Sequence, residues 1–235
     1  MGILQRFQEV CSMSLYENLM KVKKKIDQST AKSGRDPDSV VLIAVTKEAD
    51  MDSIRQILEF GIKNLAENYA QKLVRKSEQF TNAIWHFIGR IQTNKLKYIV
   101  PRCEYIHSVW REEELKEINK IAERFQKIQK ILIEVNVSGE PTKAGVDPIK
   151  LEKLLKAASS LSAVQIVGLM TMAPYVENPQ EVRWIFSKLR QLRDIYRKDF
   201  PSLEHLSMGM SNDFEVALEE GATMIRIGRA IFKGE

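Results

Sequence analysis

Short apolar runs and longer stretches with helical spacing alternate along this chain. The run at 40–46, VVLIAVT, is almost entirely apolar, which is typical of a strand buried on both faces. The stretch after it places Ile54, Ile57 and Leu58 three and four positions apart, as in a helix that buries one face. The repeated exchange between these two patterns predicts parallel βα units.

Eight segments carry the strand pattern. They are 40–47, 63–67, 84–89, 104–109, 131–137, 165–172, 205–210 and 224–228. An amphipathic helix over 3–33 precedes them, and the longest later helix is expected over 179–199. The pattern predicts an α/β fold, a closed (β/α)8 TIM barrel preceded by an N-terminal helix. An open doubly wound sheet would show the same alternation.

Length and charge favour one barrel domain over 1–235, because barrels of about 200 to 250 residues are common and no Pro/Gly/Ser-rich linker divides this chain. The net charge of +5 comes from 36 basic and 31 acidic residues that are interspersed. Even the basic run at 21–25 stands beside Glu17 and Asp27, as on a solvated helix face. We therefore expect no nucleic-acid binding.

The two cysteines and the N-terminus favour a cytoplasmic protein. Cys11 and Cys103 have neither CxxC spacing nor a disulfide framework. The first ten residues lack the order of a signal peptide, and no run approaches the ~18 apolar residues of a membrane span. We expect no membrane association and, since no dimerising segment is evident, a monomer.

Lys47 follows the first strand and is the first candidate for chemistry. The C-terminal ends of barrel strands face the mouth where active sites form. A partly buried lysine amine is more easily neutral there and can condense with an aldehyde to form an imine. The alternative is a lysine that extends its amine from a strand end into solvent.

Other polar and sulfur side chains belong to strands that end at the same rim. They are Glu67, Asn68, His86, Asn136 and Met170. The loops after strands seven and eight commonly hold a phosphate in barrels. Ser207, Ser211, Gly228 and Arg229 fit such a site, and an aldehyde with a phosphate indicates pyridoxal phosphate.

Arg226 stands two residues before Gly228 on the last strand and should point inward. A guanidinium there would donate a hydrogen bond to the pyridine nitrogen without surrendering its proton. The ring would then be a poor electron sink. Arg226 could equally belong to a buried ion pair, with Glu67 or Glu134 as partner.

The chain resembles the pyridoxal phosphate homeostasis proteins, the YggS/PROSC group, through motifs that run along nearly its whole length. These motifs are VLIAVTK at 41–47, NLAENYAQ at 64–71, WHFIGRIQTNK at 85–95, IHSV at 106–109, IEVNVSGEPTKAG at 133–145, GLMTMAP at 168–174, LSMGMSNDFEVALEEGAT at 206–223 and RIGRAIF at 226–232.

The resemblance implies a barrel of the alanine racemase N-terminal type with the cofactor as a Schiff base on Lys47. It implies a ring contact near Asn68, phosphate held around Ser207, Ser211, Gly228 and Arg229, and Arg226 at the pyridine nitrogen. Trp110 departs from the family, which more often has an acidic residue at that position. That departure concerns the polarity of the rim.

Three functions fit these residues to different degrees. The resemblance favours a carrier for intracellular vitamin B6 homeostasis that passes the cofactor to apo-enzymes, without robust catalysis and with no catalytic residue assigned. A pyridoxal phosphate-dependent amino-acid racemase would need a second base beside Lys47, for which Tyr69, Tyr105 and Tyr175 are candidates. Alanine racemases take that base from a separate β domain, whereas eight strands already occupy this chain. An imine-forming aldolase gains support only from Glu67.

Two further predictions concern metals and a second lysine. His86, His107 and His205 lack HxH or HExxH spacing, so no metal site is expected. Lys143 follows strand five and could take the aldehyde transiently, although an exposed loop lysine is the commoner identity for such a residue.

Overall fold

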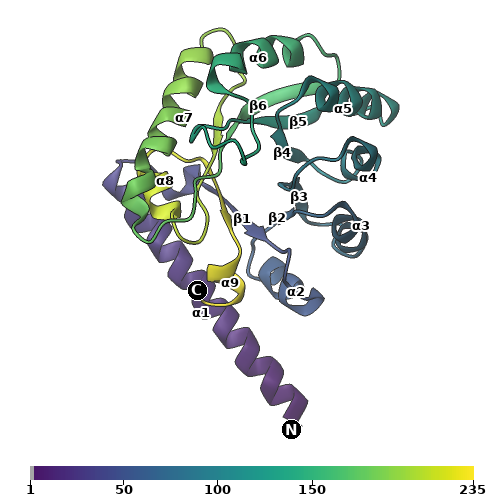
Figure 1. The fold of residues 1–235 in the computed structure, drawn as a ribbon. Coiled ribbons are helices and arrows are strands. Elements are labelled where there is room, and N and C mark those ends of the chain that lie inside the picture. The colour runs from purple at the N-terminus through teal and green to yellow at the C-terminus, as the bar shows by residue number, and fades with distance from the viewer. Residues whose placement is uncertain (1–2) are drawn as a thin grey trace.

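The computed structural model describes residues 3–235, with side chains from residue 14 onward. Eight parallel strands form a closed barrel in the order of the sequence (Figure 1). The strands are β1 (Val41–Val45), β2 (Asn64–Glu67), β3 (Ile84–Phe87), β4 (Tyr105–Val109), β5 (Gln129–Glu134), β6 (Val164–Met170), β7 (His205–Ser207) and β8 (Met224–Ile227). The barrel closes where β1 pairs with β8, with Ile43 opposite Arg226. The predicted closed barrel is confirmed.

Helices surround the barrel. They are α1 (Ile3–Lys32), α2 (Met51–Glu59), α3 (Ala70–Gln79), α4 (Leu96–Ile99), α5 (Glu112–Arg124), α6 (Leu151–Ser159), α7 (Arg183–Tyr196), α8 (Phe214–Glu219) and α9 (Arg229–Phe232). Four short 3-10 helices join them: η1 (Pro37–Ser39), η2 (Thr93–Lys95), η3 (Pro148–Lys150) and η4 (Pro179–Val182). Each strand therefore has a buried inner face and an outer face covered by helices.

Side chains that alternate along the strands form two cores. The larger lies between the strands and the helices and includes Ala44 and Leu65. The smaller lies inside the barrel and includes Ile43, Ala66 and Leu132. Because successive strand residues point to opposite faces, Ile43 and Ala44 belong to different cores.

The helix α1 packs against α8 and α9, beside the closure of β1 on β8. Leu15, Leu19, Val22 and Ile26 are buried, and their spacing of three and four positions forms one apolar stripe. Asn18 also donates a hydrogen bond to the carbonyl of Ile231 in α9. The predicted N-terminal helix thus covers the seam of the barrel.

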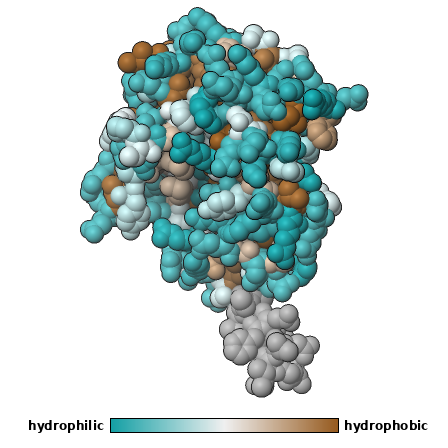
Figure 2. Space-filling model, turned by 45° about the vertical axis from the view of Figure 1, so that its right-hand side comes forward, coloured by the Kyte–Doolittle hydropathy of each residue, from teal (hydrophilic) through white to brown (hydrophobic). Residues whose placement is uncertain are grey.

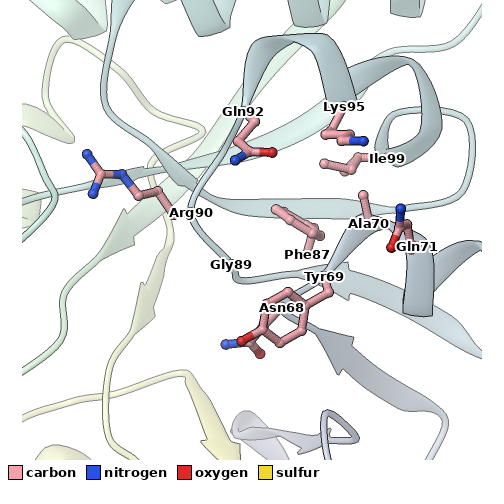
Figure 3. Close-up of a pocket in the computed structure, with 10 residues that line it drawn as sticks. All are labelled: Asn68, Tyr69, Ala70, Gln71, Phe87, Gly89, Arg90, Gln92, Lys95 and Ile99. Carbon is pink, nitrogen blue, oxygen red and sulfur yellow. The ribbon is translucent and has the colours of Figure 1, made fainter.

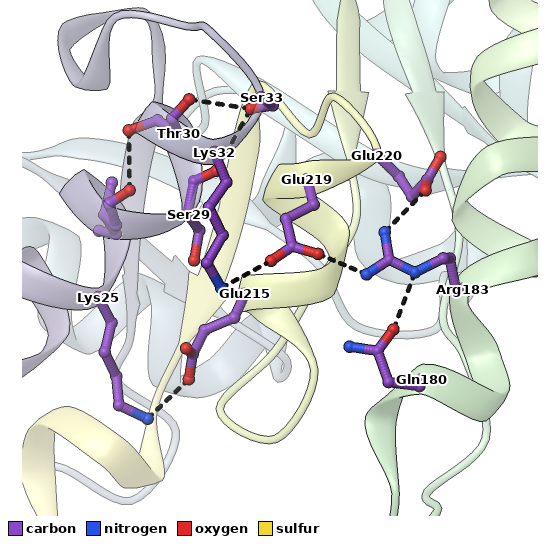
Figure 4. Close-up of polar contacts among 11 residues, drawn as sticks. Lys25, Ser29, Thr30, Lys32, Ser33, Gln180, Arg183, Glu215, Glu219 and Glu220 are labelled. Carbon is purple, nitrogen blue, oxygen red and sulfur yellow. Dashed lines mark hydrogen bonds and ion pairs between the residues drawn. The ribbon is translucent and has the colours of Figure 1, made fainter.

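Ion pairs reinforce this packing at the surface (Figure 4). Lys25 pairs with Glu215 at 2.7 Å, and Lys32 pairs with Glu219 at 3.2 Å. Glu219 also pairs with Arg183 of α7, so one carboxylate links three helices. Exposed pairs contribute little individually, and the buried stripe of α1 carries most of the stabilisation.

Several boundaries differ from the prediction. The helix expected over 179–199 is divided into η4 and α7, since Pro179 starts a tighter turn at Asn178. The strand β5 begins at Gln129, and β7 ends at Ser207 where the backbone turns toward Gly209. The side chain of Cys11 lies outside the described residues, and Cys103 is a buried free thiol whose pKa burial raises.

The face shown in Figure 2 is mainly hydrophilic, with separate hydrophobic residues between charged ones. None of the described helices is both long and apolar enough to cross a membrane. The monomeric state stays a prediction.

Candidate functional site

A cavity of about 420 Å³ opens at the C-terminal mouth of the barrel. Loops after β1, β2, β6, β7 and β8 enclose it, so residues far apart in the sequence meet there. Six of the nine predicted cofactor residues line it: Lys47, Asn68, Ser211, Arg226, Gly228 and Arg229. A volume of several hundred Å³ with a few convergent polar groups suits a small molecule.

Lys47 lies in the cavity wall, but its side chain is 47% exposed. About half of the side chain is therefore buried, although β1 ends at Val45 and Lys47 stands in the loop beyond it. Its amine is 4.0 Å from the Glu48 carboxylate, which is also exposed. The amine can therefore reach both the cavity and solvent.

Two other lysines hold the backbone at the end of β1. Lys76 donates to the carbonyl of Thr46 and to the Glu67 carboxylate, each at 2.5 Å. Thr46 donates from its hydroxyl to the same carboxylate at 3.0 Å. Lys72 donates to the carbonyl of Lys47 at 2.6 Å. We call Lys76, Glu67 and Thr46 the β1 clamp.

The β1 clamp shows which group pairs with Glu67. This carboxylate is fully buried and paired with Lys76, so it is not the ion-pair partner of Arg226. Lys72 and Lys76 of α3 were absent from the sequence-based site. The sequence does contain a signal for them. Lys72 and Lys76 follow the NLAEN motif and are four residues apart, which places both on one face of a helix.

Arg226 is 3% exposed and lies inside the barrel beneath the mouth. It donates from Nη1 to the Ser207 hydroxyl at 2.5 Å and from Nη2 to the carbonyl of Thr171 at 3.0 Å. Burial lowers its pKa to about 10, which still leaves the guanidinium charged near neutral pH. Its remaining N–H groups can donate to a ligand in the cavity.

Two carboxylates lie near Arg226 without pairing with it within ion-pair distance. Burial raises the pKa of Glu134 to about 7, while Arg226 acts in the opposite direction. Burial also raises the pKa of Asp213, which accepts a hydrogen bond from the backbone N–H of Met210 at 2.6 Å. The buried ion pair proposed between Arg226 and Glu134 is therefore not formed.

The loops after β7 and β8 form the other end of the cavity. Ser211 accepts a hydrogen bond from the N–H of Ala230 at 3.2 Å, which joins the two loops. A Cβ on Gly228 would lie 3.3 Å from the carbonyl oxygen of Val45, so a larger residue would press on β1. Small residues at these positions let an anion approach the backbone of the two loops.

Ser211 and Asn212 stand just before α8, but neither caps this helix. Ser211 accepts from α9, and Asn212 donates to the carbonyl of Val176 at 2.9 Å. The N-cap position belongs to Asp213, which makes no side-chain capping bond. The Ser211 hydroxyl and the Asn212 amide therefore stabilise the loop and do not cap α8.

Three predicted residues lie outside the cavity lining. His86 is fully buried below the mouth, and Met170 is packed in the inner core. Ser207 is buried beneath Arg226 and not among the loop residues of the anion end. Met172 lines the cavity instead of Met170, because it stands beyond the end of β6.

Asn68 carries the clearest unused polar atom. Its side chain lines the cavity, and its Oδ1 is buried without a hydrogen-bond partner. It also borders a second hollow of about 430 Å³, which is lined by Phe87, Gln92 and Lys95 among others (Figure 3). A buried polar atom without a partner is costly, and a bound ligand would supply one.

The remaining candidates are placed as follows. Tyr175 lines the cavity and is exposed, whereas Tyr69 lines only the second hollow. Tyr105 stacks on His86 inside the barrel, with ring centroids 4.7 Å apart. Lys143 does not line the cavity, and Trp110 packs against the outer core.

The fold and this site define a class. The model of the family described as alanine racemase, N-terminal domain, matches residues 17–235. An alanine racemase of Clostridium difficile has the same fold, with a TM-score of 0.72 at 13% identity, over 93% of this chain and 56% of that chain. The molecule is a (β/α)8 barrel of the alanine racemase N-terminal type.

More similar proteins narrow the class. The pyridoxal phosphate homeostasis protein of Aquifex aeolicus is 43% identical over 223 residues, which cover 94% of this chain and 98% of the relative. The structure of PipY from Synechococcus elongatus with pyridoxal phosphate bound gives a TM-score of 0.81 at 32% identity, over 93% and 99% of the two chains. This chain belongs to the family of pyridoxal phosphate homeostasis proteins.

Proposed function

We propose that this chain binds pyridoxal 5'-phosphate as a Schiff base on Lys47 and serves intracellular vitamin B6 homeostasis. One observation carries the proposal. A single cavity brings together a lysine, a buried arginine and the loops after β7 and β8, with the small residues Ser211 and Gly228. These groups match an aldehyde, a pyridine nitrogen and a phosphate, respectively. The relatives named above support the same assignment.

The cofactor fits the donor set of the cavity. Lys47 would hold the aldehyde carbon, and Arg226 would donate to the ring nitrogen. Ser211, Gly228 and Arg229 would hold the phosphate, and Asn68 would find a partner for its unpaired Oδ1. Pyridoxal phosphate would supply a reactive aldehyde. Its ring withdraws electrons less strongly when the pyridine nitrogen stays unprotonated.

Carriage is favoured over racemisation. Arg226 is charged and only donates, so it would keep the ring nitrogen unprotonated. Racemisation also needs a second base opposite Lys47. Tyr175 lines the cavity, but it is 74% exposed, and no side-chain hydrogen bond to another described residue orients its hydroxyl. The racemase remains the alternative function.

We also propose that the cofactor is passed to pyridoxal phosphate-dependent apo-enzymes in the cytoplasm by a monomer. The support is the exposed position of Lys47 at an open mouth, where an incoming amine could replace it. A deeply buried amine would not permit such exchange without a conformational change.

The experiment uses the purified protein incubated with pyridoxal phosphate. The expected result is a visible absorption band, a borohydride-stable label in the peptide that contains Lys47, and no exchange between D- and L-alanine. A colourless protein that takes up no cofactor would reject the proposal. Rapid alanine exchange by the same sample would establish the racemase instead.

A further inference from the structure

A continuous row of hydrogen-bonded side chains crosses the barrel interior below the cavity. It begins at Arg226 on β8, passes through Ser207 on β7, His107 on β4 and His86 on β3, and ends at Asn64 on β2. The four successive distances are 2.5, 2.9, 2.9 and 3.0 Å. We call these five residues the interior chain.

Four of the five residues of the interior chain are shielded from water, and Asn64 at its end is partly exposed. Ser207, His107 and His86 are fully buried, and Arg226 is nearly so. Other inward positions of the same barrel are apolar, including Ile43, Ala66 and Leu132. Burying a polar group at such depth costs folding free energy unless the group is hydrogen-bonded. A row in which every member is paired therefore indicates a specific role.

The donors and acceptors fix one direction for the interior chain. Arg226 can only donate, so the Ser207 oxygen accepts from it and the Ser207 hydroxyl donates to Nδ1 of His107. His107 then carries its proton on Nε2 and donates to Nδ1 of His86. His86 in turn carries its proton on Nε2 and donates to Oδ1 of Asn64.

The opposite direction fails at Ser207. If Asn64 donated to His86, each histidine would donate toward Arg226, and the Ser207 oxygen would receive two donors. Its own hydroxyl proton would then lack an acceptor in the chain. Burial lowers the pKa of His86 to about 3 and the pKa of His107 well below its usual value, so both rings are neutral.

We propose that Ser207, His107 and His86 are positioning residues that hold the Arg226 guanidinium in the one orientation in which it can donate to a ring nitrogen in the cavity. This inference rests on the proposed function, because the ring is that of pyridoxal phosphate. Ser207 fixes Nη1, the carbonyl of Thr171 fixes Nη2, and the interior chain fixes Ser207. None of the three positioning residues lines the cavity.

The interior chain orients Arg226 in place of a carboxylate. Glu134 and Asp213 are the acidic groups that act on Arg226, and neither forms an ion pair with it among the described residues. The groups that receive its side-chain N–H donors are therefore the Ser207 hydroxyl and the Thr171 carbonyl, and the Ser207 hydroxyl is itself directed by His107. Tyr105 stacked on His86 keeps that ring from turning.

The first test concerns the protein without cofactor. Nitrogen NMR of the histidine rings should show His107 and His86 as neutral Nε2–H tautomers that do not titrate between about pH 5 and about pH 8. His205 lies outside the interior chain and provides the internal comparison. An Nδ1–H tautomer at either position, or titration in that range, would overturn the inference.

The second test follows the absorption of the bound cofactor against pH. Ser207→Ala and His107→Phe should shift the pH midpoint by about one unit in the same direction as Arg226→Gln, and weaken binding about tenfold. His107→Gln keeps one acceptor and one donor, so its shift should be smaller. His205→Phe and Ser29→Ala change a ring and a buried hydroxyl outside the interior chain and should match the wild type.

The outcomes separate this inference from the proposed function. Wild-type spectra and affinity in folded Ser207→Ala and His107→Phe, with a changed Arg226→Gln, would reject the positioning role and leave cofactor binding intact. Failure of the wild type to bind any cofactor would reject the proposed function. If the variants do not fold, the tautomers of the wild-type histidines decide the matter.

Discussion

The ends of β1 and β8 position their key side chains in opposite ways. Just beyond β1, Lys76 holds the backbone carbonyl of Thr46 and Lys72 holds that of Lys47. The Lys47 side chain itself is half exposed. At β8 the side chain of Arg226 is buried and held by two hydrogen bonds. The aldehyde capture and release proposed for Lys47 requires an accessible amine, whereas the ring-nitrogen contact proposed for Arg226 requires a donor with a fixed direction.

The largest effect should come from removing the Lys47 amine. Lys47→Ala should abolish the borohydride-stable label, since the aldehyde loses the amine that the cavity presents. Arg226 and the phosphate loops remain, so weaker non-covalent binding should persist. Peptide mapping after reduction measures the label, with Lys143→Ala as the control. A label that stays in the same peptide region after Lys47→Ala would exclude this lysine as the attachment site.

The next effect should come from opening the β1 clamp. Lys76→Met leaves the fully buried Glu67 carboxylate without its partner and should cost about 3 to 5 kcal/mol of unfolding free energy. Urea denaturation measures this, and Lys25→Met, which breaks the exposed pair with Glu215, should change stability by less than ~1 kcal/mol.

The double variant Glu67→Gln/Lys76→Met should recover much of the loss, because no buried charge is left unpaired. Equal losses in Lys76→Met and Lys25→Met would show that the clamp does not hold β1 through its buried charge.

A smaller effect should come from the carboxyl beside Arg226. The pKa of Glu134 is raised from its usual 4.5 to about 7, so the folded state keeps a proton that the unfolded state releases between these values. Stability from this group is therefore lost as the pH rises through that window, by up to about 3 kcal/mol.

Glu134→Gln stays neutral and should remove that decline. Unfolding free energies of wild type and variant at about pH 5 and about pH 8 give the difference, to which Glu114, Arg90 and Arg226 contribute as the charged neighbours. Parallel pH profiles would mean that Glu134 is ionised throughout in the folded protein.

The smallest effect should come from the hydrogen bond between Ser211, in the loop after β7, and Ala230, in α9. Ser211→Ala removes the acceptor for the Ala230 N–H and should weaken cofactor binding about two- to tenfold, the range for one neutral hydrogen bond. Equilibrium titration measures this, with the exposed Ser160→Ala on α6 as control. Unchanged affinity would place the phosphate away from Ser211.

The sequence predicts the barrel well because each strand is a short apolar run followed by a helix with a clear stripe. It also brings Lys47, Arg226 and Gly228 to one cavity, since strand order alone determines which ends meet. It misplaces Ser207, because β7 ends earlier than the apolar pattern does and the side chain turns inward to Arg226.

Side-chain partners are harder to predict than the fold. Nothing in the spacing of Ser207, His107 and His86 reveals that they form one row, because three strands must first close around them. The half-exposed position of Lys47 follows from where β1 stops, and the apolar run at 40–46 does not fix that end point.

The closure of β8 on β1 has a consequence for protein synthesis. Strands β7 and β8 and the loops that follow them are the last parts of the barrel to leave the ribosome, whereas Lys47 emerges early. A nascent chain that ends before residue 224 exposes the lysine without the loops that would retain a phosphate. If pyridoxal phosphate binds at this cavity as proposed, its full set of contacts exists only after both ends of the barrel have joined.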